Sequence, residues 1–230
     1  MAQRRRGIKH FAFLASLRFN NNVSMKNTKT ALLVIDCQNY FFDPASPAYL
    51  PASKRILPRV NKLIALAQAR KWPVVFTIHG PSCSPGNLML AQWRHLPKGE
   101  QCELRQGLKV PGKARIIHKQ HYSAFIGTGL EKYLNKRGIG RVVFCGAMTH
   151  LCVDTTARQA FMLGFQPVIV RDACCSKSPA LHRAALLALG HGFAEITRAP
   201  TTETRNSELK NRLKNSVVHP FSVSVVRVNS

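Results

Sequence analysis

The feature that most constrains this sequence is an apolar run followed directly by an amphipathic pattern. The run covers residues 141–145, and from residue 153 to residue 163 apolar side chains recur at the spacing of one helical face. Residues 146–152 join the two segments and end in Cys152. This order predicts a strand, a tight turn and a helix, with Cys152 in the first turn of the helix.

A cysteine in that position has two interpretations. A thiol at a helix N-terminus feels the positive end of the helix dipole and the free backbone N–H groups, which favour the thiolate. The same N–H groups could hold an oxyanion, so a nucleophile and its stabilising donors would share one turn. The alternative is that Cys152 is a small buried hydrophobic residue, as most intracellular cysteines are.

Two further apolar runs also end in a side chain that can take part in chemistry. Residues 31–35 are followed by Asp36, and residues 114–118 are followed by Lys119. Short, continuous apolar runs of this kind are typical of buried parallel strands. In open α/β sheets, ligands bind beyond the carboxyl ends of the strands. We therefore expect Asp36, Lys119 and Cys152 to meet in one crevice.

The motifs around these residues resemble those of the isochorismatase-like cysteine hydrolases, which include nicotinamidases and N-carbamoylsarcosine amidases. The resemblance covers residues 28–198 and rests on separated motifs in matching order and spacing. These motifs are residues 33–41, 119–125, 146–153 with 156–161, and 172–173. The resemblance assigns Asp172, in the last motif, a structural role.

The resemblance also implies the roles of the site residues. Asp36, Lys119 and Cys152 would form the catalytic triad, and the Ala147–Met148 peptide bond would be cis. Backbone N–H groups of Met148 and Cys152 would form the oxyanion hole. The implied activity is the cleavage of a C–N bond in a small amide or carbamoyl compound, through a thioester on the cysteine.

Two other functions remain as alternatives. Some family members lack the nucleophilic cysteine and cleave a vinyl ether by acid catalysis, so Cys152 favours amide hydrolysis over that reaction. The second alternative is a basic binding protein without enzymatic activity, because one fold can host many functions.

The substrate pocket is expected to involve the loops at residues 39–52 and 79–112. Four side chains are its candidate contacts, namely Phe41, His79, Trp93 and Phe125. Metal-dependent nicotinamidases use an Asp-x-His pair and further histidines, whereas the 39–52 loop contains Asp43 and no histidine. The sequence therefore supports no metal site, and no cofactor is expected.

The remaining periodicity predicts a three-layer, Rossmann-like α/β fold, with a mostly parallel sheet flanked by helices on both faces. Strands are expected at residues 30–36, 72–78, 114–118, 141–145, 166–170 and 193–197. One helix is expected at residues 56–71, with Pro58 in its first turn, where a missing N–H is tolerated. Asp172 is expected at the end of the fifth strand.

Three parts are expected along the chain. Residues 28–200 would form the hydrolase domain, and residues 201–230 a basic C-terminal extension. Residues 1–27 would form a basic, disordered N-terminal extension. Residues 1–24 contain no acidic residue, so an organellar leader is one interpretation of them, and an over-long gene start or a disordered arm is the other.

Composition restricts the partners and the location. Lys and Arg number 34 against 10 Asp and Glu, a net charge of +24, yet no nucleic-acid motif is present, so only non-specific nucleic-acid binding is expected. No apolar stretch approaches the roughly 20 residues of a membrane span. Seven cysteines without paired spacing favour free thiols and a cytoplasmic location. The resemblance implies a homo-oligomer, either a dimer or a tetramer.

Overall fold

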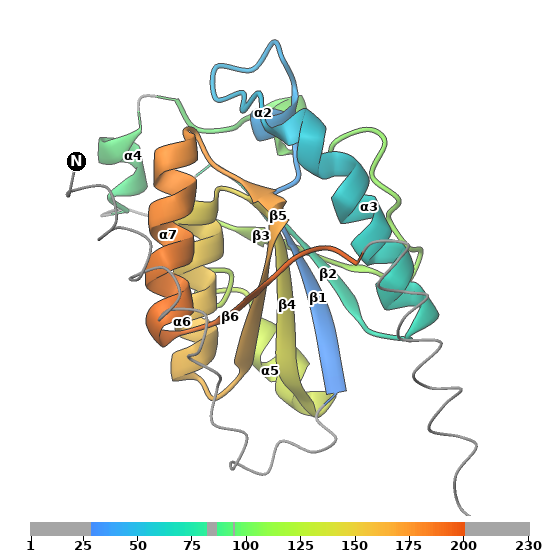
Figure 1. Ribbon diagram of the computed structural model, residues 1–230. Helices are drawn as coiled ribbons and strands as arrows, with labels where there is room; N and C mark the ends of the chain where they lie inside the picture. The colour runs from blue at the N-terminus through green and yellow to red at the C-terminus, as the bar shows by residue number, and fades with distance from the viewer. Residues whose placement is uncertain (1–28, 82–86, 94, 201–230) are drawn as a thin grey trace, which may run out of the picture. The chain divides into compact units, whose positions relative to one another are not determined.

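A six-stranded parallel sheet forms the centre of the protein (Figure 1). The computed structural model describes residues 29–81, 87–93 and 95–200, so the predicted extensions at 1–27 and 201–230 lie outside the described residues, as does Cys83. The strands follow the order β3-β2-β1-β4-β5-β6 across the sheet. Their bounds are β1 (Lys29–Ile35), β2 (Val74–His79), β3 (Arg115–Lys119), β4 (Ile139–Ala147), β5 (Gln166–Cys175) and β6 (Glu195–Thr197).

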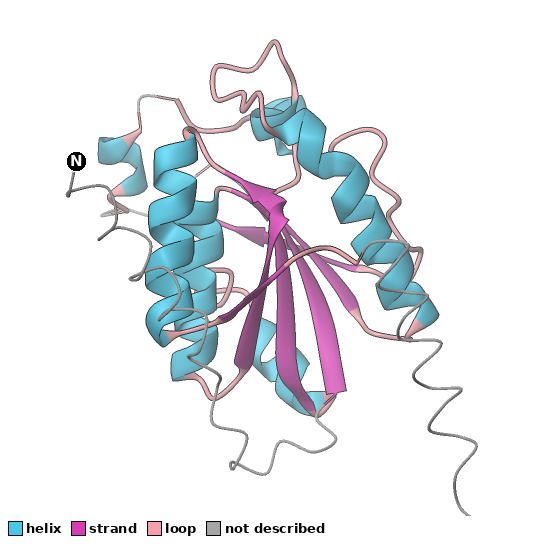
Figure 2. Ribbon diagram, viewed as in Figure 1, coloured by secondary structure: helices cyan, strands magenta, loops and turns pink. Residues whose placement is uncertain are grey.

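Helices cover both faces of the sheet (Figure 2). Helix α3 (Ser53–Ala69) packs on one face, and α5 (Leu130–Lys136), α6 (Asp154–Met162) and α7 (Pro179–Gly192) pack on the other. The shorter helical segments are α2 (Asn39–Phe42), α4 (Met89–Gln92), the 3₁₀ turn η1 (Gly99–Cys102) and the π-helical turn η2 (Thr149–Val153). None of the helices in the described part of the chain is both long and apolar enough to cross a bilayer.

The alternation of side chains along β1 shows how the two layers are filled. Leu32 and Val34 join the core beneath α3, whereas Leu33 and Ile35 join the core beneath α5, α6 and α7. Because successive side chains of a strand point to opposite faces, a wholly apolar strand needs a helical layer on each side. The predicted three-layer α/β fold is confirmed.

Two predicted details of the elements are wrong. Helix α3 begins at Ser53, so Pro58 lies beyond the first turn, inside the helix. Strand β5 continues to Cys175, so Asp172 lies within the strand and does not end it. The Asp172 carboxylate accepts a hydrogen bond from the Ala199 N–H at 2.8 Å and lies 3.4 Å from the Arg59 guanidinium. These contacts tie neighbouring segments together and fit the structural role that was expected of Asp172.

The strand order creates a switch point between β1 and β4. The chain builds the sheet outward from β1 in one direction and from β4 in the other, and ligands of open α/β sheets bind beyond the carboxyl ends of strands at such a point. The strands approach closely there, because a Cβ on Gly146 would lie 2.0 Å from the Ile35 carbonyl oxygen. Gly146 also has a φ of +117°, which an L side chain rarely adopts. Glycine at position 146 therefore allows β1 and β4 to lie this close together at the switch point.

Candidate active site

Asp36 and Lys119 form a buried ion pair at the carboxyl end of the sheet. The Lys119 Nζ lies 2.8 Å from the Asp36 Oδ2, and both side chains are inaccessible to solvent. Burial by itself would lower the pKa of Lys119, but the Asp36 carboxylate and the neighbouring Cys152 outweigh burial and raise this pKa above its usual value. The lysine is therefore a permanent cation, and it comes from the edge strand β3 to reach a carboxylate that follows β1.

The thiol of Cys152 contacts the same ammonium group. Its Sγ lies 3.3 Å from the Lys119 Nζ, and the residue is almost fully buried in the π-helical turn η2. The pKa of Cys152 is raised to about 12. Burial is the main cause of the increase, the positive charge of Lys119 opposes it, and the negative charge of Asp36 adds to it. Cys152 thus lies in the turn that leads into α6 and not, as predicted, in the first turn of the α-helix, and burial opposes the thiolate that a helix N-terminus was expected to favour. The thiol keeps its proton until a base removes it.

Thr77 holds the Asp36 carboxylate in place. The Thr77 hydroxyl donates to the Asp36 Oδ1 at 2.5 Å and accepts from the Asp36 N–H at 3.1 Å. Asp36 has a φ of +46°, a conformation that is uncommon outside glycine and clusters at functional sites. Thr77 was not predicted as a site residue, although it is the one hydroxyl within the apolar run 74–78, which was a usable signal.

The turn that carries Cys152 is tied to the rest of the protein at several points. The Met148 carbonyl accepts from the N–H groups of Leu151 and Val153, at 3.1 and 3.2 Å. The Thr156 hydroxyl donates to the Cys152 carbonyl at 2.5 Å and accepts from the Ala124 N–H at 3.1 Å. Thr156 thus links the turn that carries Cys152 to the segment that follows Lys119. The peptide bond between Ala147 and Met148, just before this turn, is cis.

His79 lies beside the ion pair. It ends β2 opposite Lys119 in the strand register, and Gln38 clamps its backbone, accepting from its N–H at 2.7 Å and donating to its carbonyl at 2.9 Å. The side chain is buried, and neither ring nitrogen has a hydrogen-bond partner among the described residues. Burial, followed by the charge of Lys119, lowers the pKa of His79 to about 4. The imidazole is therefore neutral at physiological pH.

The other three predicted pocket residues lie in different environments. Phe41 is buried in the core beneath α3, where its ring meets Tyr40 edge-on at 4.9 Å. Phe125 is buried in the opposite core and stacks on Phe165 at 5.9 Å. Trp93 is partly exposed, and its indole N–H donates to the Tyr122 hydroxyl at 2.8 Å. Of the four candidates, the described contacts bring only His79 next to the triad.

The donor set does not fit a metal ion. Among the described residues, no three side chains of His, Cys, Asp or Glu lie close enough together to hold one. A protein site for zinc needs at least three such ligands. No chemical step is therefore assigned to a metal in this site.

A buried carboxylate, ammonium and thiol at the switch point of a parallel sheet define an α/β cysteine hydrolase, and comparisons with known proteins agree. The chain is 36% identical to nicotinamidase 3 of Arabidopsis thaliana over 172 residues, which are 72% of this chain and 83% of that protein. It is 26% identical to N-carbamoylsarcosine amidase of an Arthrobacter species, over 73% of this chain and 67% of that protein.

The solved structures and the family model extend this agreement. The nicotinamidase/pyrazinamidase of Bacillus subtilis superposes with a TM-score of 0.67 at 27% identity, over 74% of this chain and all of that one. The model of the isochorismatase domain matches residues 30–201. The chain belongs to the isochorismatase family, as the sequence motifs predicted.

Proposed function

We propose that this protein hydrolyses a C–N bond in a small amide or carbamoyl compound, with Cys152 as the nucleophile. The contact of one buried ammonium group, Lys119, with both Asp36 and Cys152 supports this proposal most directly. A permanent cation between a carboxylate and a thiol lets a proton pass from the thiol to the carboxylate while the net charge of the group stays constant. Its amidase relatives make the same class of reaction the first one to test.

The first half of the reaction forms a thioester. Asp36 takes the thiol proton as the Cys152 sulfur attacks the carbonyl carbon, since a thiol with a pKa of about 12 needs a base at neutral pH. Negative charge then develops on the carbonyl oxygen, and the backbone N–H groups of Met148 and Cys152 stabilise it. The Leu151 and Val153 N–H groups are already bonded to the Met148 carbonyl and are not available for this task.

The second half releases the products and restores the thiol. Asp36 gives its proton to the leaving nitrogen, the C–N bond breaks, and ammonia or an amine departs. Water then attacks the thioester carbon while Asp36 takes a proton from it, and that proton returns to the sulfur as the C–S bond breaks. Lys119 stays in contact with Asp36 through both halves, and its positive charge balances the negative charge of the carboxylate.

His79 and Trp93 are proposed to contact the substrate. A neutral imidazole offers one N–H donor and one acceptor nitrogen, and an amide group offers the complementary acceptor and donors. A buried ring without partners is costly unless a ligand or water completes its hydrogen bonds, which supports a role for His79 in binding. Phe41 and Phe125 would act behind these contacts by shaping the apolar walls.

The two alternative functions are less well supported. A vinyl-ether hydrolase needs no nucleophilic thiol, so the contact between Cys152 and Lys119 would serve no purpose in it. A binding protein without activity has no need of a buried ion pair, which is costly to form unless its geometry is good. We also propose a homo-oligomer, either a dimer or a tetramer, and a cytoplasmic location.

The decisive experiment measures ammonia release from a panel of small amides and carbamoyl compounds, with the Cys152→Ala and Cys102→Ala variants as a matched pair. Both variants lose one thiol, but Cys102 lies in η1, outside the triad. We expect release by the wild type and by Cys102→Ala, and none by Cys152→Ala. Absence of turnover and of any acyl adduct on Cys152, by intact mass, across the panel contradicts the proposal. Cleavage of a vinyl ether by Cys152→Ala would favour the first alternative.

A further inference from the structure

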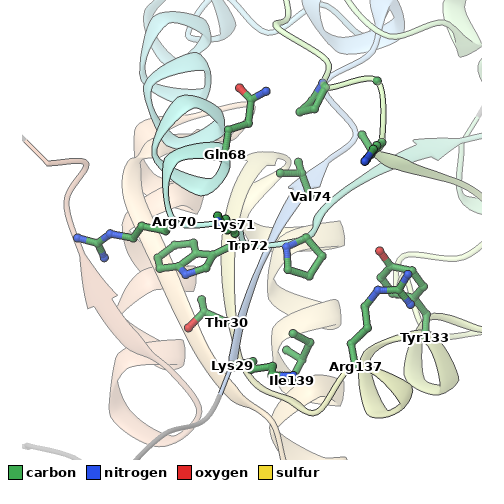
Figure 3. A pocket seen from close by; sticks show the side chains of 15 residues that line it. Lys29, Thr30, Gln68, Arg70, Lys71, Trp72, Val74, Tyr133, Arg137 and Ile139 are labelled. Carbon is green, nitrogen blue, oxygen red and sulfur yellow. The ribbon is translucent and has the colours of Figure 1, made fainter.

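A cavity of about 900 Å³ lies at the opposite end of the sheet from Asp36, Lys119 and Cys152 (Figure 3). It is formed where β1, β2 and β4 begin, together with the loop before β3 and the end of α5. Strand β1 has seven residues and separates the two ends. At about 3.3 Å per residue, this places the cavity roughly 20 Å from Asp36. It is therefore distinct from the catalytic site.

The charges around this cavity have one sign. Its lining includes no Asp or Glu, and it includes Lys29, Lys71, Lys113 and Arg137, all of which are exposed. In the part of the chain that the structure describes, none of these four cations lies within 4.0 Å of a carboxylate oxygen. Cations that converge on a cavity without acidic partners produce a strongly positive local potential.

Tyr133 organises two of the guanidinium groups at this end of the sheet. The Arg137 guanidinium carbon lies 3.9 Å from the centre of the Tyr133 ring, and that of Arg115 lies 4.8 Å from it. Stacking on a ring restrains a guanidinium group but leaves its N–H donors free to bind an anion. Figure 3 shows Tyr133, Arg137 and the indole of Trp72 in the lining of the same cavity.

The C-termini of two helices would repel an anion at this cavity, but their negative charge is smaller than the positive charge of the cations. Helices α3 and α5 both end next to the cavity, and each C-terminus carries the equivalent of roughly half a negative charge. Together they amount to about one negative charge. The positive charge of the four lining cations named above therefore exceeds the negative charge of the helix ends.

We propose that this cavity binds a ligand that carries adjacent phosphate groups. Several cations around a space of this size suit two or three phosphates better than a single carboxylate, because the negative charges of the ligand are spread along a chain. Arginine binds phosphate through two parallel N–H donors, and lysine binds it as a point charge. The site also gives a local role to part of the net charge of +24, which the hydrolase reaction does not use.

Isothermal titration of the full-length protein at about 0.15 M salt, an ionic strength that screens distant charges, tests the proposal. The probes are inorganic triphosphate and adenosine triphosphate. The first variant is Lys113→Gln with Arg137→Gln, which removes two positive charges from the cavity. The matched control is Lys132→Gln with Lys136→Gln, which removes two exposed charges from α5, outside the cavity lining.

The expected result is saturable binding by the wild type, weakened at least about tenfold by the cavity variant and less than about threefold by the control. Equal affinity for the two probes would assign recognition to the phosphate chain alone. If adenosine triphosphate binds more tightly than inorganic triphosphate, and the difference disappears in Trp72→Leu, the site also recognises a base that stacks on Trp72. No saturable binding by the wild type, or equal weakening in both variants, overturns the proposal. Ammonia release should stay unchanged in both variants, so this test is independent of the proposed hydrolase activity.

Discussion

The ammonium nitrogen of Lys119 lies 3.3 Å from the sulfur of Cys152, yet burial holds the pKa of that thiol at about 12. A neighbouring cation alone would lower the pKa of the thiol, so desolvation is the stronger effect here. The site therefore holds a neutral thiol next to a buried ion pair, and in the proposed mechanism the thiolate forms only when Asp36 takes the proton.

This relationship predicts slow alkylation of Cys152 in the free enzyme. Since the thiolate is the reactive form, and its fraction falls tenfold for each pH unit below the pKa, we expect carbamidomethylation at pH 7.5 to be at least about 100-fold slower in the native protein than in the urea-unfolded chain. The native rate should rise steadily with pH beyond 9. Peptide mass spectrometry after timed exposure to iodoacetamide measures both rates. Equal native and unfolded rates would contradict the raised pKa.

Replacing Lys119 by Met should remove both stability and activity. The change leaves the Asp36 carboxylate buried without its partner, which typically costs about 3–5 kcal/mol in the free energy of unfolding. Ammonia release should fall at least about 1,000-fold, because the variant loses the cation that contacts both the proposed base and the proposed nucleophile. Urea unfolding and the ammonia assay measure the two effects. Lys119→Arg is the control that keeps the charge, and an unchanged free energy of unfolding in Lys119→Met would contradict a buried ion pair.

Replacing Thr77 by Val should impair the reaction more than the fold. The variant loses the hydroxyl that donates to the Asp36 Oδ1, so we expect a loss of about 1–2 kcal/mol of stability and a drop of about 10- to 100-fold in kcat. Thr77→Ser keeps the hydroxyl and should retain most of the activity. A kcat in Thr77→Val equal to that of Thr77→Ser would show that this hydrogen bond does not position the base.

His79 should make the protein sensitive to acid. A folded-state pKa of about 4, lowered from 6.5, means that the unfolded chain binds a proton first as the pH falls. The stability contributed by neutral His79 is present above pH 6.5 and is lost as the pH falls toward 4, to a total of about 3 kcal/mol. Unfolding of wild type and His79→Gln at several pH values measures this. The difference between the two proteins should change over that range, and a constant difference would contradict the lowered pKa. If His79 also contacts the substrate, the variant should have a raised KM.

Replacing Gly146 by Ala should prevent β1 and β4 from lying as close together as they do at the switch point. The new Cβ would lie 2.0 Å from the Ile35 carbonyl oxygen, and backbone atoms cannot yield cheaply. We expect a loss of more than about 3 kcal/mol, which adds a steric clash to the cost of a positive φ. Gly138→Ala is the matched control, because Gly138 also has a positive φ, of +65°, but nothing lies within 4 Å of its added Cβ. Equal melting temperatures in the two variants would exclude the close approach as the cause.

The fold was predictable because its signals are local. Apolar runs that end in Asp36 and Lys119, and the run that leads toward Cys152, indicated three strands of a parallel sheet and one shared edge. The bounds of β5 and the start of α3 were less predictable, since hydrogen bonds to neighbouring strands and packing on the sheet extend elements beyond their local pattern.

Local patterns in the chain were enough to identify the reactive groups and to predict that they follow strands of one parallel sheet. The protonation of these groups and their hydrogen-bond partners, in contrast, depend on how the chain packs. The neutral thiol of Cys152, the neutral ring of His79 and the bond from Thr77 to Asp36 all depend on residues far apart in the chain. Desolvation is the summed effect of every surrounding atom, so no local pattern in the sequence can specify it.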